Sequence, residues 1–222
     1  FLRYITSHTK KKYVVLAPTG IAAVNVGGVT LHSFFRIPFK PITPDDPDFA
    51  RDRIKARMKY PSSLVKLLHN LDLIIIDEIS MVRADIIDFI DKLLRTYTNN
   101  FREPFGGKQL LLVGDIFQLE PVVTGDMRDI LRNYYHNFYF FSARAFLEIK
   151  IVPIELRKVY RQTDSDFVSL LDRIRMGITT PEDLRQLNSR CISPLAPPVP
   201  KARSKKFTMT LATRRDMVDY IN

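Results

Sequence analysis

The sequence predicts an α/β fold with a mostly parallel sheet, because buried-strand segments and helical segments alternate along the chain. Three short apolar segments lack the polar–apolar alternation of a half-exposed strand, which is typical of strands buried on both faces of a parallel sheet. They are Tyr13 to Ala17, Leu73 to Ile76 and Leu110 to Val113. Each ends abruptly in polar or glycine residues, and open α/β sheets bind their ligands at the carboxyl ends of the strands.

The segments between and after these strands have helical periodicity. One apolar face is expected after the second strand, formed by Ile86, Ile90, Leu93, Leu94 and Tyr97. Another is expected later in the chain, formed by Phe167, Leu170, Leu171 and Ile174. Gly177 is positioned to end that helix, and Thr180 followed by Pro181 has the pattern of a helix N-cap with proline at the first helical position.

The chain is expected to contain one good-sized domain core and the beginning of a second domain. We expect the first over residues 1–153, with an insertion at about residues 37–70 that combines prolines, aspartates and a basic helical segment. Residues 154–222 are expected to begin a second domain of the same kind. In that part, residues 193–206 have the proline-rich composition of a linker or long surface loop, and residues 207–211 are a candidate strand.

Composition and charge exclude several classes of protein. A single cysteine excludes an internal disulfide and a cysteine cluster for zinc, and the apolar segments are too short to span a membrane. We therefore expect a cytoplasmic location. The 34 Lys and Arg residues against 24 Asp and Glu residues give a net charge of +10, which favours a polyanionic partner. Charge alone does not distinguish nucleic acid from a membrane surface.

Two adjacent carboxylates, Asp77 and Glu78, follow the second strand, so we expect them at the ligand-facing edge of the sheet. Mg²⁺ on nucleotide phosphates prefers a carboxylate, reached directly or through water, and a second carboxylate can orient or deprotonate an attacking water. We therefore assign Asp77 to Mg²⁺, through water, and Glu78 to the role of general base. A strand that simply ends in solvated acids is the competing interpretation.

Two further residues have the chemistry of a phosphoryl-transfer site. Gln118 lies just past the end of the third strand, where its amide could bond a terminal phosphate or the attacking water, although Gly114-Asp115 is also ordinary turn chemistry. Arg161 could neutralise charge that develops on a transferring phosphoryl group, although a lone arginine is more often a surface charge.

The sequence lacks the phosphate-binding loop G-x-x-x-x-G-K-[ST]. Its only Gly-Lys pair is Gly107-Lys108, and Arg102 stands where the first glycine of the loop is needed. In proteins with this loop a helix follows it, and Phe1 to Ile5 is a candidate for that helix. We therefore expect the loop before Phe1 and expect the 222-residue chain alone to hydrolyse no ATP.

Several motifs, in their order along the chain, resemble those of the PIF (petite integration frequency) family of superfamily-one DNA helicases, and the resemblance covers nearly the whole chain. Most discriminating is Pro104 to Gln109, preceded by Asp91-Lys92-Leu93, which resembles the signature that separates this family from its RecD-like relatives. The variant with Thr30 to Phe35 and an acidic, proline-rich insertion resembles the bacterial members. The other motifs are Ala17 to Ala23, Gly27 to Phe34, Asp77 to Met81, Gly114 to Val122 and Tyr160 to Gln162.

The resemblance implies a RecA-like motor domain that uses ATP and Mg²⁺ to move along single-stranded DNA. The DNA contacts it implies are Pro18, Thr19, Gly20, Thr30, His32 and Phe35. Hydroxyl and imidazole groups can donate to phosphates, and Phe34 or Phe35 could stack on a base, with at least one of the two phenylalanines in the core. Glu120 departs from the proline expected before Pro121. A bacterial location, a monomer, and a role in repair, recombination or telomere maintenance are implied by the family alone.

Two other functions fit some of the same residues. A small-molecule P-loop kinase would share Asp77 and Glu78, but it gives no reason for the motifs around Pro18 and His32. A nucleic-acid-binding P-loop module without turnover would share the DNA contacts. DNA-stimulated ATP hydrolysis discriminates both alternatives from a motor.

Overall fold

The computed structural model describes residues 1–160, 162–191 and 211–221 of the chain. The chain divides into two compact units, Phe1–Leu156 and Arg157–Asn222. The boundary predicted after residue 153 lies close to this division. That the second unit begins another RecA-like domain stays a prediction.

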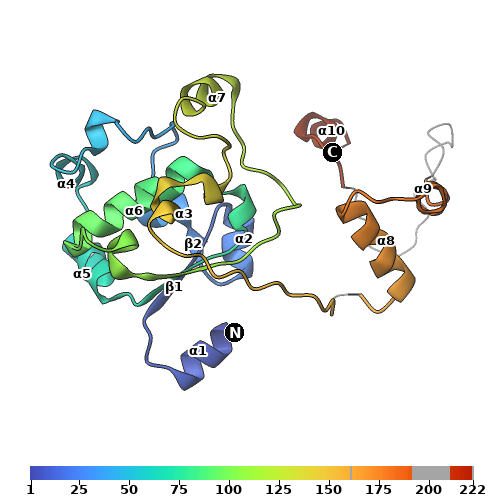
Figure 1. The fold of residues 1–222 in the computed structure, drawn as a ribbon, viewed down its shortest axis with the longest axis horizontal. Coiled ribbons are helices and arrows are strands. Elements are labelled where there is room, and N and C mark those ends of the chain that lie inside the picture. The colour runs from blue at the N-terminus through green and yellow to red at the C-terminus, as the bar shows by residue number, and fades with distance from the viewer. Residues whose placement is uncertain (161, 192–210, 222) are drawn as a thin grey trace. The chain divides into compact units, whose positions relative to one another are not determined.

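The first unit contains a four-stranded parallel sheet in the order β2-β1-β3-β4 (Figure 1). The predicted fold class, α/β with a parallel sheet, is therefore confirmed. Strand β2 was not predicted, because two residues are too short to show a period. The strands are β1 Tyr13–Ala17, β2 Val29–Thr30, β3 Leu73–Ile76 and β4 Gln109–Leu112.

The strands supply two hydrophobic layers, because successive side chains point to opposite faces of the sheet. Leu16, Ile74 and Ile76 belong to the larger cluster, and Val15 and Ile75 belong to the smaller one. All four residues of β3 are buried, as the unbroken apolar segment predicts, whereas the leucines of β4 are half-buried. β3 is paired on both sides, and β4 pairs only with β3 among the described strands.

Helices cover both faces of the sheet. Helix α1 (Leu2–His8) places Ile5 in the smaller cluster, and α6 (Ala84–Thr98) packs in the larger one on the opposite face. The face of α6 predicted from periodicity is buried in full. The remaining helices of this unit are α2 Gly20–Asn25, α3 Leu31–Phe35, α4 Ile54–Met58, α5 Ser62–Asn70 and α7 Gly125–Leu131, with short 3-10 turns η1 Pro47–Phe49, η2 Ile79–Met81, η3 Pro104–Gly107, η4 Phe140–Ser142 and η5 Arg144–Leu147.

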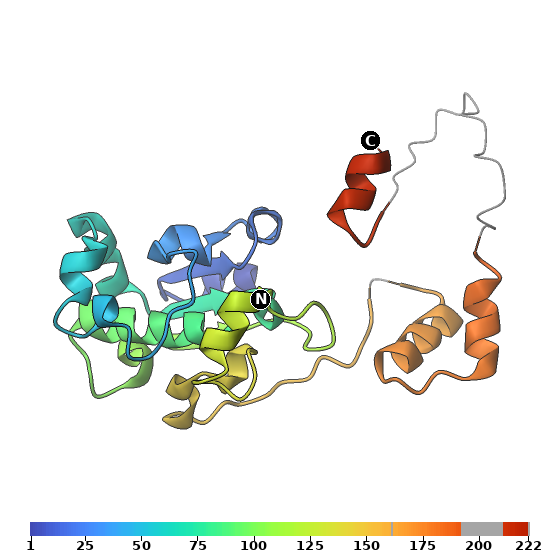
Figure 2. The same cartoon turned by 90° about the horizontal axis from the view of Figure 1, so that it is seen from above.

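The predicted insertion at residues 37–70 is a packed part of the unit rather than a loose loop. It gathers at one end of the unit, drawn in blue to teal in Figure 2, and contains η1, α4 and α5. Phe49 and Ile54 are fully buried in the larger cluster. The basic segment predicted as a helix at residues 51–57 begins as turns and becomes helical at Ile54.

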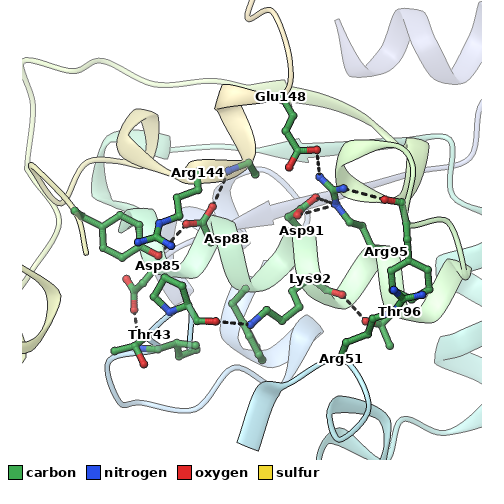
Figure 3. A pocket seen from close by; sticks show the side chains of 16 residues that line it. Thr43, Arg51, Asp85, Asp88, Asp91, Lys92, Arg95, Thr96, Arg144 and Glu148 are labelled. Carbon is green, nitrogen blue, oxygen red and sulfur yellow. Dashed lines mark hydrogen bonds and ion pairs between the residues drawn. The ribbon is translucent and has the colours of Figure 1, made fainter. Parts of the chain in front are cut away.

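Three aspartates on α6 hold three separate loops. Asp85 accepts the backbone N–H of Ile42 at 3.0 Å, Asp88 accepts that of Ala145 at 2.9 Å, and Asp91 accepts that of Phe105 at 2.5 Å. They are spaced three residues apart, so they lie along one side of the helix. A cavity of about 300 Å³ lies beside them, and Figure 3 shows their carboxylates together with Lys92, Arg95 and Arg144.

The second unit is helical where the structure describes it. Helix α8 spans Ser165–Arg175 and is closed by Met176 and by Gly177, which has a φ of +68°. Helix α9 (Pro181–Asn188) begins with the predicted Thr180 cap. Thr180 and Asp183 form a reciprocal capping box, and Asp183 also binds Arg173 of α8 at 2.9 Å. Helix α10 spans Arg215–Ile221. The predicted proline-rich loop and all but Leu211 of the candidate strand lie outside the described residues.

Candidate functional site

The carboxyl ends of the four parallel strands bring most of the predicted site residues to one edge of the sheet. The segment at Pro18 follows β1, the segment at His32 follows β2, the pair Asp77-Glu78 follows β3, and Gln118 follows β4. Since β1 is paired with both β2 and β3, the predicted DNA contacts adjoin the predicted metal and base residues.

The acid pair occupies a sharp turn of the backbone. The N–H of Asp77 donates to the Leu16 carbonyl at 2.8 Å and so extends the ladder between β1 and β3. Glu78 then adopts a left-handed conformation, with a φ of +51°, which is uncommon for a residue other than glycine. Strained backbone of this kind costs about 1–3 kcal/mol and is concentrated at functional sites. The turn therefore supports a role beyond a solvated strand end.

Among the described residues, neither acid of this pair forms an ion pair with a cation. Both are half-buried, and within the described ranges no lysine, arginine or histidine nitrogen lies within 4.0 Å of either carboxylate. The part of the chain that the structure describes contains no group of three or more His, Cys, Asp and Glu side chains that could hold a metal ion. A lone carboxylate suits Mg²⁺, which keeps several waters and takes its other ligands from phosphates. Asp77 therefore fits a metal that is bound together with a nucleotide.

The turn after β4 packs tightly against the acid pair. The N–H of Ile79 donates to the Val113 carbonyl at 3.0 Å. A Cβ at Gly114 would lie 3.0 Å from that same backbone nitrogen, so the two strand ends leave no room for a side chain there. Gln118 closes the next turn by donating its N–H to the Asp115 carbonyl at 3.0 Å, and its side chain is exposed. Its amide is thus available to a ligand at the edge.

Both predicted threonine contacts are helix N-caps. The Thr19 hydroxyl accepts the Ala22 N–H at 3.3 Å, and the Thr30 hydroxyl accepts the Ser33 N–H at 3.1 Å. A hydroxyl that accepts in this way still has its own hydrogen to donate. Pro18 is half-buried and Gly20 is exposed, which suits residues that shape the turn after β1.

His32 is half-buried, and the exposed ring of Phe39 stacks on its imidazole. The rings of His32 and Phe39 are stacked, with centroids 4.9 Å apart and an interplanar angle of 5°. Burial lowers the pKa of His32, the positive charge of Arg83 lowers it further, and Asp85 raises it in part. The lowered pKa favours the neutral form of His32 at pH 7, and a neutral imidazole can donate one N–H to a phosphate.

The assignment of Phe35 to DNA is wrong. Phe35 is fully buried in the larger cluster, one helical turn after the equally buried Leu31, so its ring has no face available to a base. Phe34 packs edge-on against it at 4.8 Å. The exposed aromatic ring is Phe39, which we had not predicted, with 91% of its surface accessible. Its position between Pro38 and Pro41, where no helix can continue, was the signal available in the sequence.

Two predicted elements of the nucleotide site are not described by the structure. Arg161 lies outside the described residues, although its neighbour Tyr160 is exposed. The sequence contains no phosphate-binding loop. The residues present thus fit the metal-facing and water-facing side of a nucleotide site. In the described residues, no helix is both long and apolar enough to cross a membrane.

The profile of the family described as PIF1-like helicase matches residues 1–184. Among curated proteins, the chain is 36% identical over 223 residues to the ATP-dependent DNA helicase PIF1 of Danio rerio, covering 99% of this chain and 31% of that protein. It is 35% identical over 170 residues to the ATP-dependent DNA helicase Pif1 of Campylobacter jejuni, covering 76% of this chain and 35% of that protein. The chain thus spans about a third of the length of these relatives.

Solved structures of Bacteroides Pif1 are similar to this chain. The Pif1 helicase in complex with ADP-AlF3 and ssDNA has a TM-score of 0.83 at 40% identity, covering 99% of this chain and 48% of that one. Bacteroides Pif1 bound to ssDNA has a TM-score of 0.76 at 45% identity, covering 86% of this chain and 44% of that one. This chain therefore spans less than half of either structure.

Proposed function

Because the chain belongs to the PIF1-like helicase family, we propose that the protein at its natural length couples ATP hydrolysis to movement along single-stranded DNA. The observation that carries the proposal is the meeting of two kinds of residue at one sheet edge. The acid pair follows β3, and the capping threonines and His32 follow β1 and β2 directly beside it. The ATP-dependent names of the relatives and the ssDNA complexes of Bacteroides Pif1 support it.

The two acids have separate roles at the nucleotide. Asp77 would hold Mg²⁺ through water, and the bound metal would supply charge neutralisation on the phosphates. Glu78 accepts a proton from water or orients that water, since its carboxylate is half-buried and forms no ion pair with any cation in the described part of the chain. Gln118 orients the same water or a phosphate oxygen, and Arg161 is assigned to charge that develops during transfer.

The DNA contacts that we propose lie on the segments that follow the neighbouring strands β1 and β2. Thr19, Thr30 and His32 donate to phosphates, and Pro18 and Gly20 set the path of the turn after β1. The Asp77 N–H is bonded to the Leu16 carbonyl, two residues before Pro18. This hydrogen bond joins the backbone of the acid pair to the strand that leads into the loop assigned to DNA. A monomer and a bacterial cytoplasmic location remain expectations from the resemblance.

Separate substitutions of the two acids test the proposal in the protein at its natural length. Glu78→Gln keeps the shape of the side chain and removes the base, so ATP should still bind with Mg²⁺ while turnover falls by about 10²-fold or more. Asp77→Asn should instead make nucleotide affinity more dependent on Mg²⁺ concentration. Glu182→Gln, which changes an exposed carboxylate of α9, is the matched control and should change neither.

Near-normal turnover in Glu78→Gln would overturn the mechanism. Equal and small effects of both substitutions would favour the interpretation of a solvated strand end. Normal ATP and DNA binding with no turnover in the unsubstituted protein would indicate a binding module instead of a motor.

A further inference from the structure

The His32–Phe39 pair has an exposed aromatic face at the edge already described. Phe39 is stacked on His32 with nearly parallel rings, and 91% of its surface is accessible. The imidazole therefore lies beside one face of the ring in an offset stack, and most of the ring surface remains uncovered. An aromatic ring with one supported face and one open face is the form of platform on which nucleobases stack.

The backbone on both sides of Phe39 is fixed, so its exposure does not reflect a loose loop. On the N-terminal side, Ile37 is buried and its N–H donates to the His32 carbonyl at 3.0 Å. On the C-terminal side, the Ile42 N–H is held by Asp85 at 3.0 Å. The Lys40 carbonyl accepts from Arg83 at 3.4 Å. The ring is thus presented from a segment that is anchored before and after it.

Two cations at the segment around Phe39, Arg83 and Lys40, are engaged in contacts within the protein. Arg83 forms two hydrogen bonds of 2.8 Å with Asp85, and Lys40 lies 2.9 Å from Asp46. His32 itself is half-buried, and its ring lies against Phe39 rather than against an acid. These two cations are therefore already paired with acids of the protein, and the open ring of Phe39 is the feature that a ligand can contact here. Contact with the flat face of an uncharged ring system is the interaction that remains.

We propose that Phe39, supported by His32, is a base-stacking residue that takes one nucleobase of single-stranded DNA on its open face. The inference rests on the proposed function, because it names the group that receives a base beside the phosphate donors Thr19, Thr30 and His32. Stacking on Phe39 is a contact that every base can make, and a protein that moves along DNA of any sequence requires contacts of this kind.

Equilibrium binding of a fluorescent single strand by the protein at its natural length, without nucleotide, tests the inference. Phe39→Ala should weaken binding by about 5- to 100-fold, the range expected for loss of one base–aromatic stack. Its dependence on salt should match that of the unsubstituted protein, since no phosphate contact is lost. Phe39→Trp should restore affinity.

Tyr4→Ala is the matched control. Tyr4 is 61% exposed and is stacked on His8 with ring centroids 4.3 Å apart, so the substitution also removes an exposed ring from a histidine. Both residues lie on α1, which packs on the face of the sheet opposite to the larger hydrophobic cluster. DNA affinity should be unchanged. Because Phe39 is exposed, Phe39→Ala should also keep the melting temperature of the unsubstituted protein, which separates lost binding from lost folding.

An abasic substitution makes the test specific to stacking. One abasic position in the strand should weaken binding by the unsubstituted protein and have no further effect in Phe39→Ala. If the unsubstituted protein binds single strands and Phe39→Ala binds equally well, the inference is wrong and the proposed function stands. If the unsubstituted protein binds no single-stranded DNA, the proposed function fails first.

Discussion

Removal of the Asp91 carboxylate should destabilise the first unit through the loop that follows α6. Asp91 accepts two hydrogen bonds of 2.9 Å from Arg95 and one from the N–H of Phe105. Phe105 has a φ of +54°, a left-handed conformation that a phenylalanine adopts only when its surroundings hold it there. Asp91→Ala would therefore release a strained loop and leave two donors without their acceptor.

The expected loss can be worked from these contacts. Removal of one partner of a buried ion pair costs about 3–5 kcal/mol. Each side chain retains 14% exposure, and Arg95 keeps its bonds to Glu148 and the Phe101 carbonyl, so part of that penalty is avoided. The unpaired Phe105 N–H adds about 1–3 kcal/mol. We expect a loss of about 2–4 kcal/mol for Asp91→Ala, and about 1 kcal/mol for Asp91→Asn, which still accepts a hydrogen bond.

Urea unfolding followed by circular dichroism measures this loss. Asp52→Ala is the control, because Asp52 is exposed and 4.0 Å from Arg53, so its removal should cost less than about 1 kcal/mol. A free energy of unfolding for Asp91→Ala that equals that of the control would refute the role we assign to this carboxylate.

The pH dependence supplies a second check on Asp91. Burial raises its pKa, more than the Phe105 N–H and Arg95 lower it. Desolvation lowers the pKa of Arg95, but the hydrogen bonds that Arg95 donates to Asp91 and Glu148 raise it overall, so the carboxyl is the group of the pair that titrates. A carboxyl with a raised folded-state pKa binds its proton more readily in the folded state, so its contribution to stability falls as pH rises through that pKa. The stability of the unsubstituted protein minus that of Asp91→Asn should therefore increase as pH is lowered below neutral.

Three further predictions concern the sheet edge and the core. Phe35→Ala should destabilise the first unit by about 3–5 kcal/mol in thermal unfolding, because it removes a fully buried ring. An unchanged melting temperature would show that the ring is not part of the core. In the protein at its natural length, His32→Ala should weaken DNA binding more than ATP binding, and equal loss of both would count against its assignment to DNA. The 222-residue chain alone should hydrolyse no ATP, which a phosphate-release assay can check, since its sequence contains no phosphate-binding loop.

The elements that the sequence predicted well are those with a strong local signal. Strand β3 has four consecutive apolar residues and is buried on both faces, and α6 has an apolar face that repeats over its full length. The N-cap of α9 could be predicted because Thr180, Pro181 and Asp183 lie within one helical turn. In each case the residues that determine the structure are neighbours in the chain.

The elements that the sequence did not predict depend on residues far apart in the chain. Asp85, Asp88 and Asp91 lie on a helix that was predicted from its apolar face, but their backbone partners are as many as 57 residues away. No local pattern identifies such partners. Phe35 and Phe39 are both aromatic and close in sequence, and only the end of α3 at Arg36 separates the buried ring from the exposed one.

The rate of ATP hydrolysis by the protein at its natural length, measured with and without single-stranded DNA, tests the central claim most directly. We predict that DNA raises the rate and that the rise saturates over the same concentrations as DNA binding, because the acids that we assign to the nucleotide and the loops that we assign to DNA share one sheet edge. Hydrolysis at the same rate with and without bound DNA would contradict the claim, and phosphoryl transfer to a small molecule in its place would indicate a P-loop kinase.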